Sequence, residues 1–548
     1  MVVTREQAAS AGSAAWGKPQ DWLRSGPVFV EAFLAGAAVS VAVFLLGWRY
    51  GFNLADEGWL WYISKRTALG DVPFRDFFSY DPGRYYWSAL VFKLLGRDGF
   101  YEQLLANYLF AIAGLALVYF AMCRAELTRS WRILILLLLG IAIGFPRHKI
   151  YEQTWSLIAT AAAFLVFRAP ERIGRWLAVG VAIGLAAFFG RNSGLFLLIA
   201  AALSFLVLQV RGHRPAPAGV LAAVACGIFI GYLPMIILIG AVPGFRAPFF
   251  HSVLLTPHWS WSLPIPFPWR VHLRGLEGID RLEARAVSWL SVAVPLAYAG
   301  LLVGGMRKKG PLDGAETLAI AASAAGAGFL IQAFYTADFF HIAQGVVPFV
   351  VAAGAFSAHL WRRGARGWSS AAFGCLFALV FASWSSMEPA LAHLRRDAHG
   401  PERADAIAIQ GRFFEVPSEQ AEIMRTVQTA FENCGARDGG FFTAPYYPGL
   451  YAFLNTRSPV WDTYFLWPRS EETQQAAIGA LEQHRTALVL LNRAFAINGR
   501  ESLRLSRTNP EIVRYVLAHF ERSHQTLPAG FELYFDPGQC AHLRPANP

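Results

Sequence analysis

The sequence contains little charge and little cysteine. Only 16% of its 548 residues are Asp, Glu, Lys or Arg, whereas soluble proteins carry about 25%, so the chain cannot cover several soluble domains with polar surface. Five cysteines in this length exclude a disulfide-rich scaffold, and their spacing is unlike that of a zinc site. The C-terminal region also lacks a Gly-rich nucleotide loop and a Ser-His-Asp arrangement, so neither kind of chemistry is expected there.

Apolar residues make up 55% of the chain, and the mean hydropathy is +0.37. A spanning helix needs about 20 apolar residues. Eleven runs approach or reach this length, at 28–47, 102–123, 133–146, 153–167, 176–189, 194–210, 218–242, 286–304, 313–333, 343–361 and 369–386. The third and fifth runs are short, but the loop charges alternate only if both cross the membrane. The sequence therefore predicts a polytopic α-helical membrane protein with about 11 transmembrane helices.

Basic residues concentrate in alternate loops, and this asymmetry predicts the direction of the chain. The positive-inside rule places residues 1–27 and the Arg-rich loops in the cytoplasm. The first 27 residues lack a compact apolar core, so we expect the first span to target the chain. We predict a cytoplasmic tail at 1–27, a transmembrane domain at 28–386 and an exported domain at 387–548. The net charge of +11 favours anionic lipid, not nucleic acid, as a partner.

The C-terminal region has the pattern of a small α/β domain. Helices are predicted at 418–434, 471–485 and 509–521, and strands at 439–443, 486–491 and 531–535. Cys434 and Cys540 are its two cysteines. They could form a disulfide in an oxidising compartment or remain two buried thiols.

The first outer loop holds the densest group of ionisable and aromatic residues. Asp56 and Glu57 are adjacent and directly follow the first span. Two carboxylates at a membrane surface repel each other, and burial can hold one of them near the pKa that a general base needs. The alternative is a solvated loop start whose Trp and Tyr residues lie in the interfacial aromatic belt.

Basic residues at other outer ends of spans could hold a phosphate. Arg147, His148 and Lys149 are consecutive and could bind it through charge-assisted hydrogen bonds, although snorkelling at the interface explains them equally well. Arg191 lies between Gly190 and Gly194, where it could face a pocket or simply cap a loop.

The last candidates are Asp338 and His341, three residues apart at a helix start. They could form a hydrogen-bonded pair, contact phosphate or bind a metal, and two ligands alone favour the first two roles. The span interiors are nearly free of charge, which favours a site at the membrane surface over a transport path.

Several of these segments together resemble the bacterial GT-C glycosyltransferases, including the protein mannosyltransferase-like and aminoarabinose transferase-like proteins. The similar segments are 56–58 (Asp-Glu-Gly), 70–78 (Gly-Asp-Val-Pro-Phe-Arg-Asp-Phe-Phe) and 81–83 (Asp-Pro-Gly), with 190–194 and 338–342 as weaker landmarks. The resemblance covers roughly residues 28–386. It implies a multi-span fold and a polyprenyl-phosphate sugar donor, used on the non-cytoplasmic face with inversion at the anomeric carbon.

The resemblance also implies roles for individual residues. Asp56 matches the acidic catalytic position, and Glu57 would tune or orient it. Arg147, Lys149 and Arg191 would contact the donor phosphate, which needs positive charge as it leaves. Secondary candidates for substrate binding are His148, His341 and Asp81, although the last could simply form a turn. No cofactor is required, and a divalent metal stays open.

The implied acceptor is a glycan, a lipid or a protein of the cell envelope, and the implied location is the bacterial inner membrane with the site on the periplasmic face. Three alternatives remain. A polymerase or ligase would join whole oligosaccharides, and a transporter or flippase would move a lipid-linked saccharide. A non-catalytic scaffold would leave the acidic first loop and its basic partners unexplained.

Overall fold

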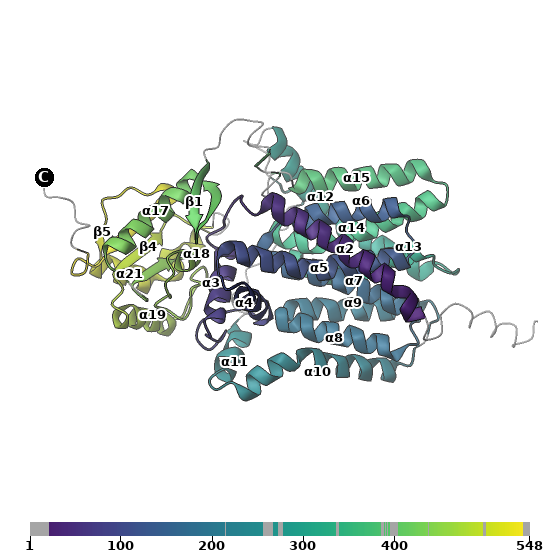
Figure 1. Cartoon of the computed structure of the whole chain (residues 1–548), viewed down its shortest axis with the longest axis horizontal. Helices are drawn as coiled ribbons and strands as arrows, with labels where there is room; N and C mark the ends of the chain where they lie inside the picture. The colour runs from purple at the N-terminus through teal and green to yellow at the C-terminus, as the bar shows by residue number, and fades with distance from the viewer. Residues whose placement is uncertain are drawn as a thin grey trace, which may run out of the picture.

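A computed structural model describes residues 21–540 except Arg214, 256–266, 272–277, 336–338, most of 385–403, Arg437 and 497–499. Within 385–403 it describes residues 388, 391, 393 and 394. Figure 1 shows two parts, a bundle of long helices and a smaller α/β region formed by the C-terminal residues. The predicted class, a helical membrane protein with a C-terminal α/β region, is confirmed.

Each of the eleven apolar runs coincides over most of its length with a helix. These are α2 (Asp21–Gly47), α5 (Phe100–Arg124), α6 (Arg129–Ile143), α7 (Ile150–Arg168), α8 (Ile173–Phe189), α9 (Arg191–Val210), α10 (Pro217–Ala241), α12 (Gly278–Arg307), α13 (Gly314–Tyr335), α14 (Phe339–Arg362) and α15 (Arg366–Trp384). Nine helices in the described part are long and apolar enough to cross a membrane. The other two are α6 with 15 residues and α8 with 17, the runs that the sequence shows as short.

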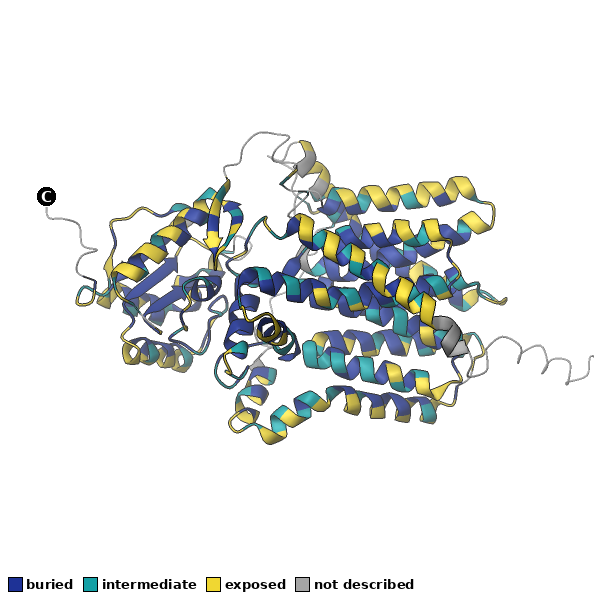
Figure 2. Cartoon of the chain, in the orientation of Figure 1, coloured by how far each residue is buried: buried dark blue, intermediate teal, exposed yellow. Residues whose placement is uncertain are grey.

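The outer helices of the bundle expose apolar side chains. Figure 2 shows exposed faces on α2, α10 and α15, while α7, α13 and α14 are buried inside. Leu46 is 66% exposed and Leu221 is 71% exposed. Apolar surface of this extent on several helices suits contact with lipid chains and not with water.

Helices α8 and α10 approach closely because both present glycines to their contact. Gly180 and Gly184 face Gly227 and Gly231, and a Cβ added at Gly227 would lie 2.3 Å from the carbonyl oxygen of Leu177. Two glycines four residues apart on each helix let the backbones touch, which is a common way for helices to associate in lipid.

We expect Gly227→Leu to force α8 and α10 apart, because the added side chain meets backbone atoms that cannot turn away. The yield of monodisperse protein in detergent and its melting temperature should both fall. Gly300→Leu is the control, since a Cβ at Gly300 on α12 meets nothing within 4 Å. Equal behaviour of the two variants would contradict a glycine-mediated contact.

The first outer loop is more regular than its sequence suggests. The segment between the first two predicted spans contains α3 (Asp56–Ala68) and α4 (Gly83–Leu95). Both helices have 13 residues, too few to span a membrane. Figure 1 places them between the bundle and the C-terminal region.

The C-terminal region contains one four-stranded sheet and a separate hairpin. The elements are β1 (Ala404–Ile409), β2 (Arg412–Pro417), α17 (Ser418–Asn433), β3 (Phe441–Ala444), α18 (Gly449–Phe453), α19 (Glu471–Gln483), β4 (Leu488–Asn492), α20 (Leu505–Thr508), α21 (Pro510–His519), β5 (Glu521–Arg522) and β6 (Phe531–Phe535). The sheet order is β3-β4-β6-β5, with β3 parallel to β4. Every residue of β4 is buried, and Cys434 and Cys540 form a disulfide.

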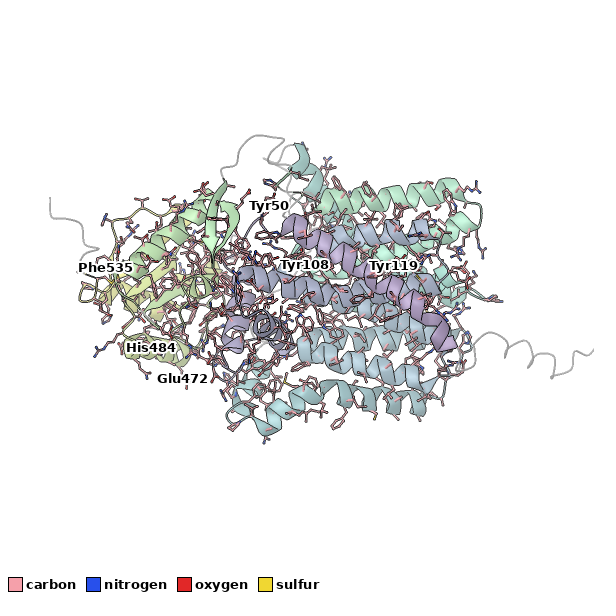
Figure 3. All side chains as sticks on the ribbon, viewed as in Figure 1. Tyr50, Tyr108, Tyr119, Glu472, His484 and Phe535 are labelled. Atoms are coloured by element: carbon pink, nitrogen blue, oxygen red, sulfur yellow. A yellow bond between two sulfur atoms is a disulfide. The ribbon has the colours of Figure 1, made fainter. Side chains whose placement is uncertain are left out.

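The C-terminal region is joined to the bundle by backbone contacts. The hairpin of β1 and β2 meets the chain that leaves α2, because the backbone N–H of Glu415 donates to the carbonyl of Arg49 at 2.8 Å. Figure 3 shows Tyr50 at this junction. Gly449 at the start of α18 lies directly against Gly58 of α3, where a Cβ on Gly58 would be 2.4 Å from the Cα of Gly449.

Candidate active site

A cavity of about 120 Å³ lies where α3, α4, the start of α7 and the C-terminal region meet. It is lined by Asp56, Trp59, Leu60, Tyr80, Arg84, His148, Lys149, His341, Tyr446 and Tyr464. The lining contains one carboxylate, several groups that can carry positive charge and three phenols. Four of the eight residues predicted from the sequence lie here, and four do not.

Asp56 begins α3, and the local sequence fixes its place. The side-chain oxygen of Asn53 accepts hydrogen bonds from the backbone N–H groups of Ala55 and Asp56, at 2.8 and 2.9 Å. Glu57 in turn accepts a hydrogen bond from the backbone N–H of Asn53 at 3.0 Å. This reciprocal capping starts the helix. It leaves the side chain of Asp56 42% exposed toward the cavity.

Glu57 and Arg147 bind each other and do not line the cavity, which differs from the roles predicted for them from the sequence. Glu57 Oε1 and Oε2 accept hydrogen bonds from Arg147 Nε and Nη2 at 2.6 and 2.8 Å, and both side chains are less than a tenth exposed. The remaining N–H groups of Arg147 donate to the carbonyls of Gly47, Tyr50 and Gly51. Because a guanidinium has five N–H donors, Arg147 has none left for a phosphate. The pair supports the start of α3 and does not line the cavity.

His148 and Lys149 do line the cavity. The three basic residues form a 3₁₀ turn, η1 (Arg147–Lys149), in which successive side chains point in different directions. His148 Nε2 is 3.7 Å from Asp56 Oδ2. The side chain of Lys149 makes no hydrogen bond or ion pair with any residue that the structure describes, so its ammonium is available to an anion.

Asp81 and Arg191 bind each other instead of facing the cavity. Asp81 accepts hydrogen bonds from the backbone N–H of Arg191 at 2.8 Å and from its Nε at 3.1 Å, which closes the start of α9. The guanidinium of Arg191 also lies near the rings of Phe74 and Phe249. Both residues therefore brace the first loop against α9. His341 lines the cavity from the start of α14, while Asp338 lies outside the described residues.

Arg84 is a cavity residue that the sequence analysis did not single out. Its Nη1 donates to Glu152 Oε1 at 2.8 Å and its Nε to the carbonyl of Phe189 at 3.0 Å. These bonds hold the guanidinium at the wall of the cavity. Its position directly after the Asp-Pro-Gly turn was the available signal.

The three tyrosines of the cavity come from distant parts of the chain. Tyr80 belongs to the first loop, whereas Tyr446 and Tyr464 belong to the C-terminal region. Burial raises the pKa of all three above the ordinary value for a phenol, so their hydroxyls stay protonated at neutral pH. No sequence spacing could have linked Tyr446 to Asp56 across this distance along the chain.

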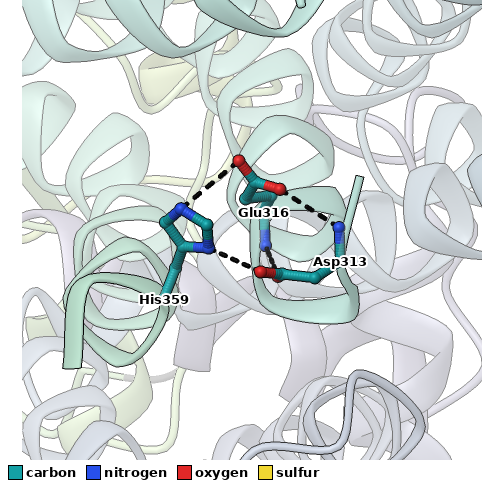
Figure 4. A group of neighbouring side chains, drawn as sticks. All are labelled: Asp313, Glu316 and His359. Atoms are coloured by element: carbon teal, nitrogen blue, oxygen red, sulfur yellow. Dashed lines mark hydrogen bonds and ion pairs between the residues drawn. The ribbon is translucent and has the colours of Figure 1, made fainter. Parts of the chain in front are cut away.

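A second group of ligand-type side chains, Asp313, Glu316 and His359, lies where α13 begins and α14 ends. Figure 4 shows the three side chains facing one another. His359 Nδ1 is 2.6 Å from Asp313 Oδ2, and its Nε2 is 3.3 Å from Glu316 Oε1. One ligand atom from each of the three residues lies within 4.8 Å of the others, a spacing compatible with a metal ion. Lys308 also lies 2.5 and 2.7 Å from the two oxygens of Glu316. This arrangement suits a clamp between α13 and α14 better than a metal site.

No protein-family model matches the chain, and no curated protein matches it. Among solved structures, the chain is similar to ArnT from Cupriavidus metallidurans bound to undecaprenyl phosphate, with 15% identity, 97% of this chain and 100% of that chain covered, and a TM-score of 0.46. It is also similar to ArnT in the apo state, with 14% identity, 95% of this chain and 100% of that chain covered, and a TM-score of 0.48. A third similar structure is the Archaeoglobus fulgidus oligosaccharyltransferase complex with Zn and sulfate, with 11% identity, 92% of this chain and 73% of that chain covered, and a TM-score of 0.44.

Proposed function

We propose that this chain is a membrane glycosyltransferase that moves a sugar from a polyprenyl-phosphate donor to a cell-envelope glycan, lipid or protein. The observation that carries the proposal is the cavity, where one half-exposed carboxylate lies among cationic side chains at the ends of membrane helices. A donor with a lipid tail and a charged head needs this combination at the membrane surface.

The residues suit the chemistry of an inverting transfer. The acceptor hydroxyl attacks the anomeric carbon while its proton passes to Asp56. The bond between that carbon and the phosphate oxygen breaks, and the phosphate leaves with the electron pair. Lys149 and Arg84 line the same cavity and would stabilise the negative charge of the leaving group. His148 and His341 are further contacts for the phosphate.

We place the site on the periplasmic face of a bacterial inner membrane. The cavity and the C-terminal region lie at the end of the bundle opposite the Arg-rich loops, which the positive-inside rule assigns to the cytoplasm. The disulfide between Cys434 and Cys540 supports the same direction, because such bonds persist in oxidising compartments. No step requires a metal.

The alternatives fit the cavity less well. A ligase for whole oligosaccharides needs a wider groove than about 120 Å³ provides. A transporter needs ionisable groups near the middle of its spans, whereas the cavity lies at the helix ends. Purified protein should be incubated with radiolabelled polyprenyl-phosphate sugars and membrane extract. Transfer of label with release of polyprenyl phosphate supports the proposal, and movement of intact donor across a vesicle membrane without cleavage contradicts it.

Lys149→Met should raise the KM for the donor by about tenfold or more, because a charge-assisted contact to phosphate contributes about 1.5–3 kcal/mol. Lys93→Met, on the exposed part of α4, is the matched control and should leave the KM unchanged. The measurement is initial rate against donor concentration. If both variants keep the wild-type KM, Lys149 does not bind the donor.

A further inference from the structure

The C-terminal region supplies part of the cavity, and Tyr446 is its residue nearest to the carboxylate. The hydroxyl of Tyr446 lies 3.4 Å from Asp56 Oδ1. His148 Nε2 is 3.7 Å from the other oxygen, Oδ2. Each oxygen of the carboxylate therefore has one defined neighbour, and the neighbour of Oδ1 belongs to a different domain.

The phenol of Tyr446 is held rigidly. Its side chain is only 5% exposed, and its ring packs against the ring of Tyr464 at 4.4 Å and near Trp59 at 6.5 Å. The backbone before it is fixed because the N–H of Phe465 donates to the carbonyl of Pro445 at 3.0 Å. Since a protonated phenol can only donate to a carboxylate, the direction of this hydrogen bond is settled.

A buried ion pair holds the loop that carries Tyr464. Asp462 Oδ1 accepts a hydrogen bond from the backbone N–H of Tyr464 at 2.8 Å. Arg469 Nη2 donates to the backbone carbonyl of Tyr464 at 2.6 Å. Asp462 and Arg469 also bind each other at 2.7 Å, and both side chains are less than a tenth exposed. The ring of Tyr464, against which Tyr446 packs, is therefore held in place by residues of the C-terminal domain.

The domain itself is placed close to Asp56. The N–H of Gly449 donates to the carbonyl of Leu54 at 2.9 Å, two residues before Asp56. The contact between Gly58 and Gly449 admits no side chain on either residue. A shift of the domain would therefore move Tyr446 relative to α3.

We propose that Tyr446 is a positioning residue that orients Asp56 through its hydroxyl, so that Oδ2 faces the acceptor. This inference rests on the proposed function, in which Asp56 accepts a proton. The C-terminal domain then supplies a residue that the active site needs for full activity. The other titratable or charged groups of the cavity are Tyr80, Arg84, His148, Lys149, His341 and Tyr464.

The test compares Tyr446→Phe with wild type in the donor-transfer assay. We expect kcat to fall roughly tenfold while the KM for the donor stays constant, because a hydrogen bond to a charged group is lost at the base only. The split between kcat and KM is the deciding readout, since a merely structural role would also lower the melting temperature or change the KM.

Tyr447→Phe is the matched control, because the hydroxyl of Tyr447 accepts a hydrogen bond from Asn492 inside the domain at 3.1 Å. It should keep the wild-type kcat. An unchanged kcat for Tyr446→Phe overturns the inference alone. A loss of kcat together with a lower melting temperature or a raised KM does so too, because that indicates a structural role. Absence of transfer by wild type overturns the proposed function and this inference together.

Discussion

Replacement of Asp56 by Asn is expected to reduce sugar transfer by about 10²–10⁴-fold, the usual contribution of a general base. Asn keeps the size and the hydrogen-bonding oxygen of the side chain, so the capping of α3 by Asn53 and the contact with Tyr446 can persist. The measured quantity is kcat in the donor-transfer assay, with the melting temperature recorded for both proteins. The melting temperature should change little, because Asp56 is half-exposed.

Asp98→Asn is the matched control for this experiment. Asp98 lies in the turn after α4, where it is 32% exposed and 3.4 Å from Lys65, and it does not line the cavity. It should retain transfer. If Asp56→Asn also retains transfer, Asp56 is not the general base. Glu57 and Asp81 are not ready replacements, because both are buried in ion pairs with Arg147 and Arg191, so the base would then be a histidine.

Glu57→Gln is expected to cause the largest loss of stability among single substitutions near the site. It leaves the buried guanidinium of Arg147 without a counter-charge, and breaking a buried ion pair in this way costs about 3–5 kcal/mol. The start of α3 should loosen, so transfer should fall as well. The measurement is thermal unfolding in detergent, in which the midpoint should drop by several degrees.

Glu501→Gln is the comparison for that loss. Glu501 also pairs with an arginine, Arg504, but its side chain is 72% exposed. Exposed pairs contribute about 0–1 kcal/mol, so the midpoint should hardly move. If the Glu57→Gln protein is as stable as wild type, the buried ion pair is dispensable and Glu57 does not stabilise the start of α3.

The sequence by itself determined the helical membrane class of the chain and most elements of the C-terminal region. All eleven apolar runs coincide over most of their length with helices, and strands form at 441–444, 488–492 and 531–535, close to the predicted ranges. These features are local, because hydropathy and periodicity are read from neighbouring residues. Asp56 was singled out for a similar reason, since it lies in the segment that follows the first span. The hairpin at 404–417 was missed because its apolar alternation is short.

Only the tertiary structure decided which charged residues face the cavity. Arg147 and Lys149 look equivalent in the sequence, yet the first is saturated by Glu57 and three carbonyls while the second has no partner among the described residues. Asp81 likewise finds Arg191 far along the chain. Charges are paired across space, and a 3₁₀ turn sends adjacent side chains in different directions. The tyrosines that complete the cavity come from a domain that is held beside α3 by contacts between distant parts of the chain, among them the Gly58–Gly449 contact and the hydrogen bond from Gly449 to Leu54.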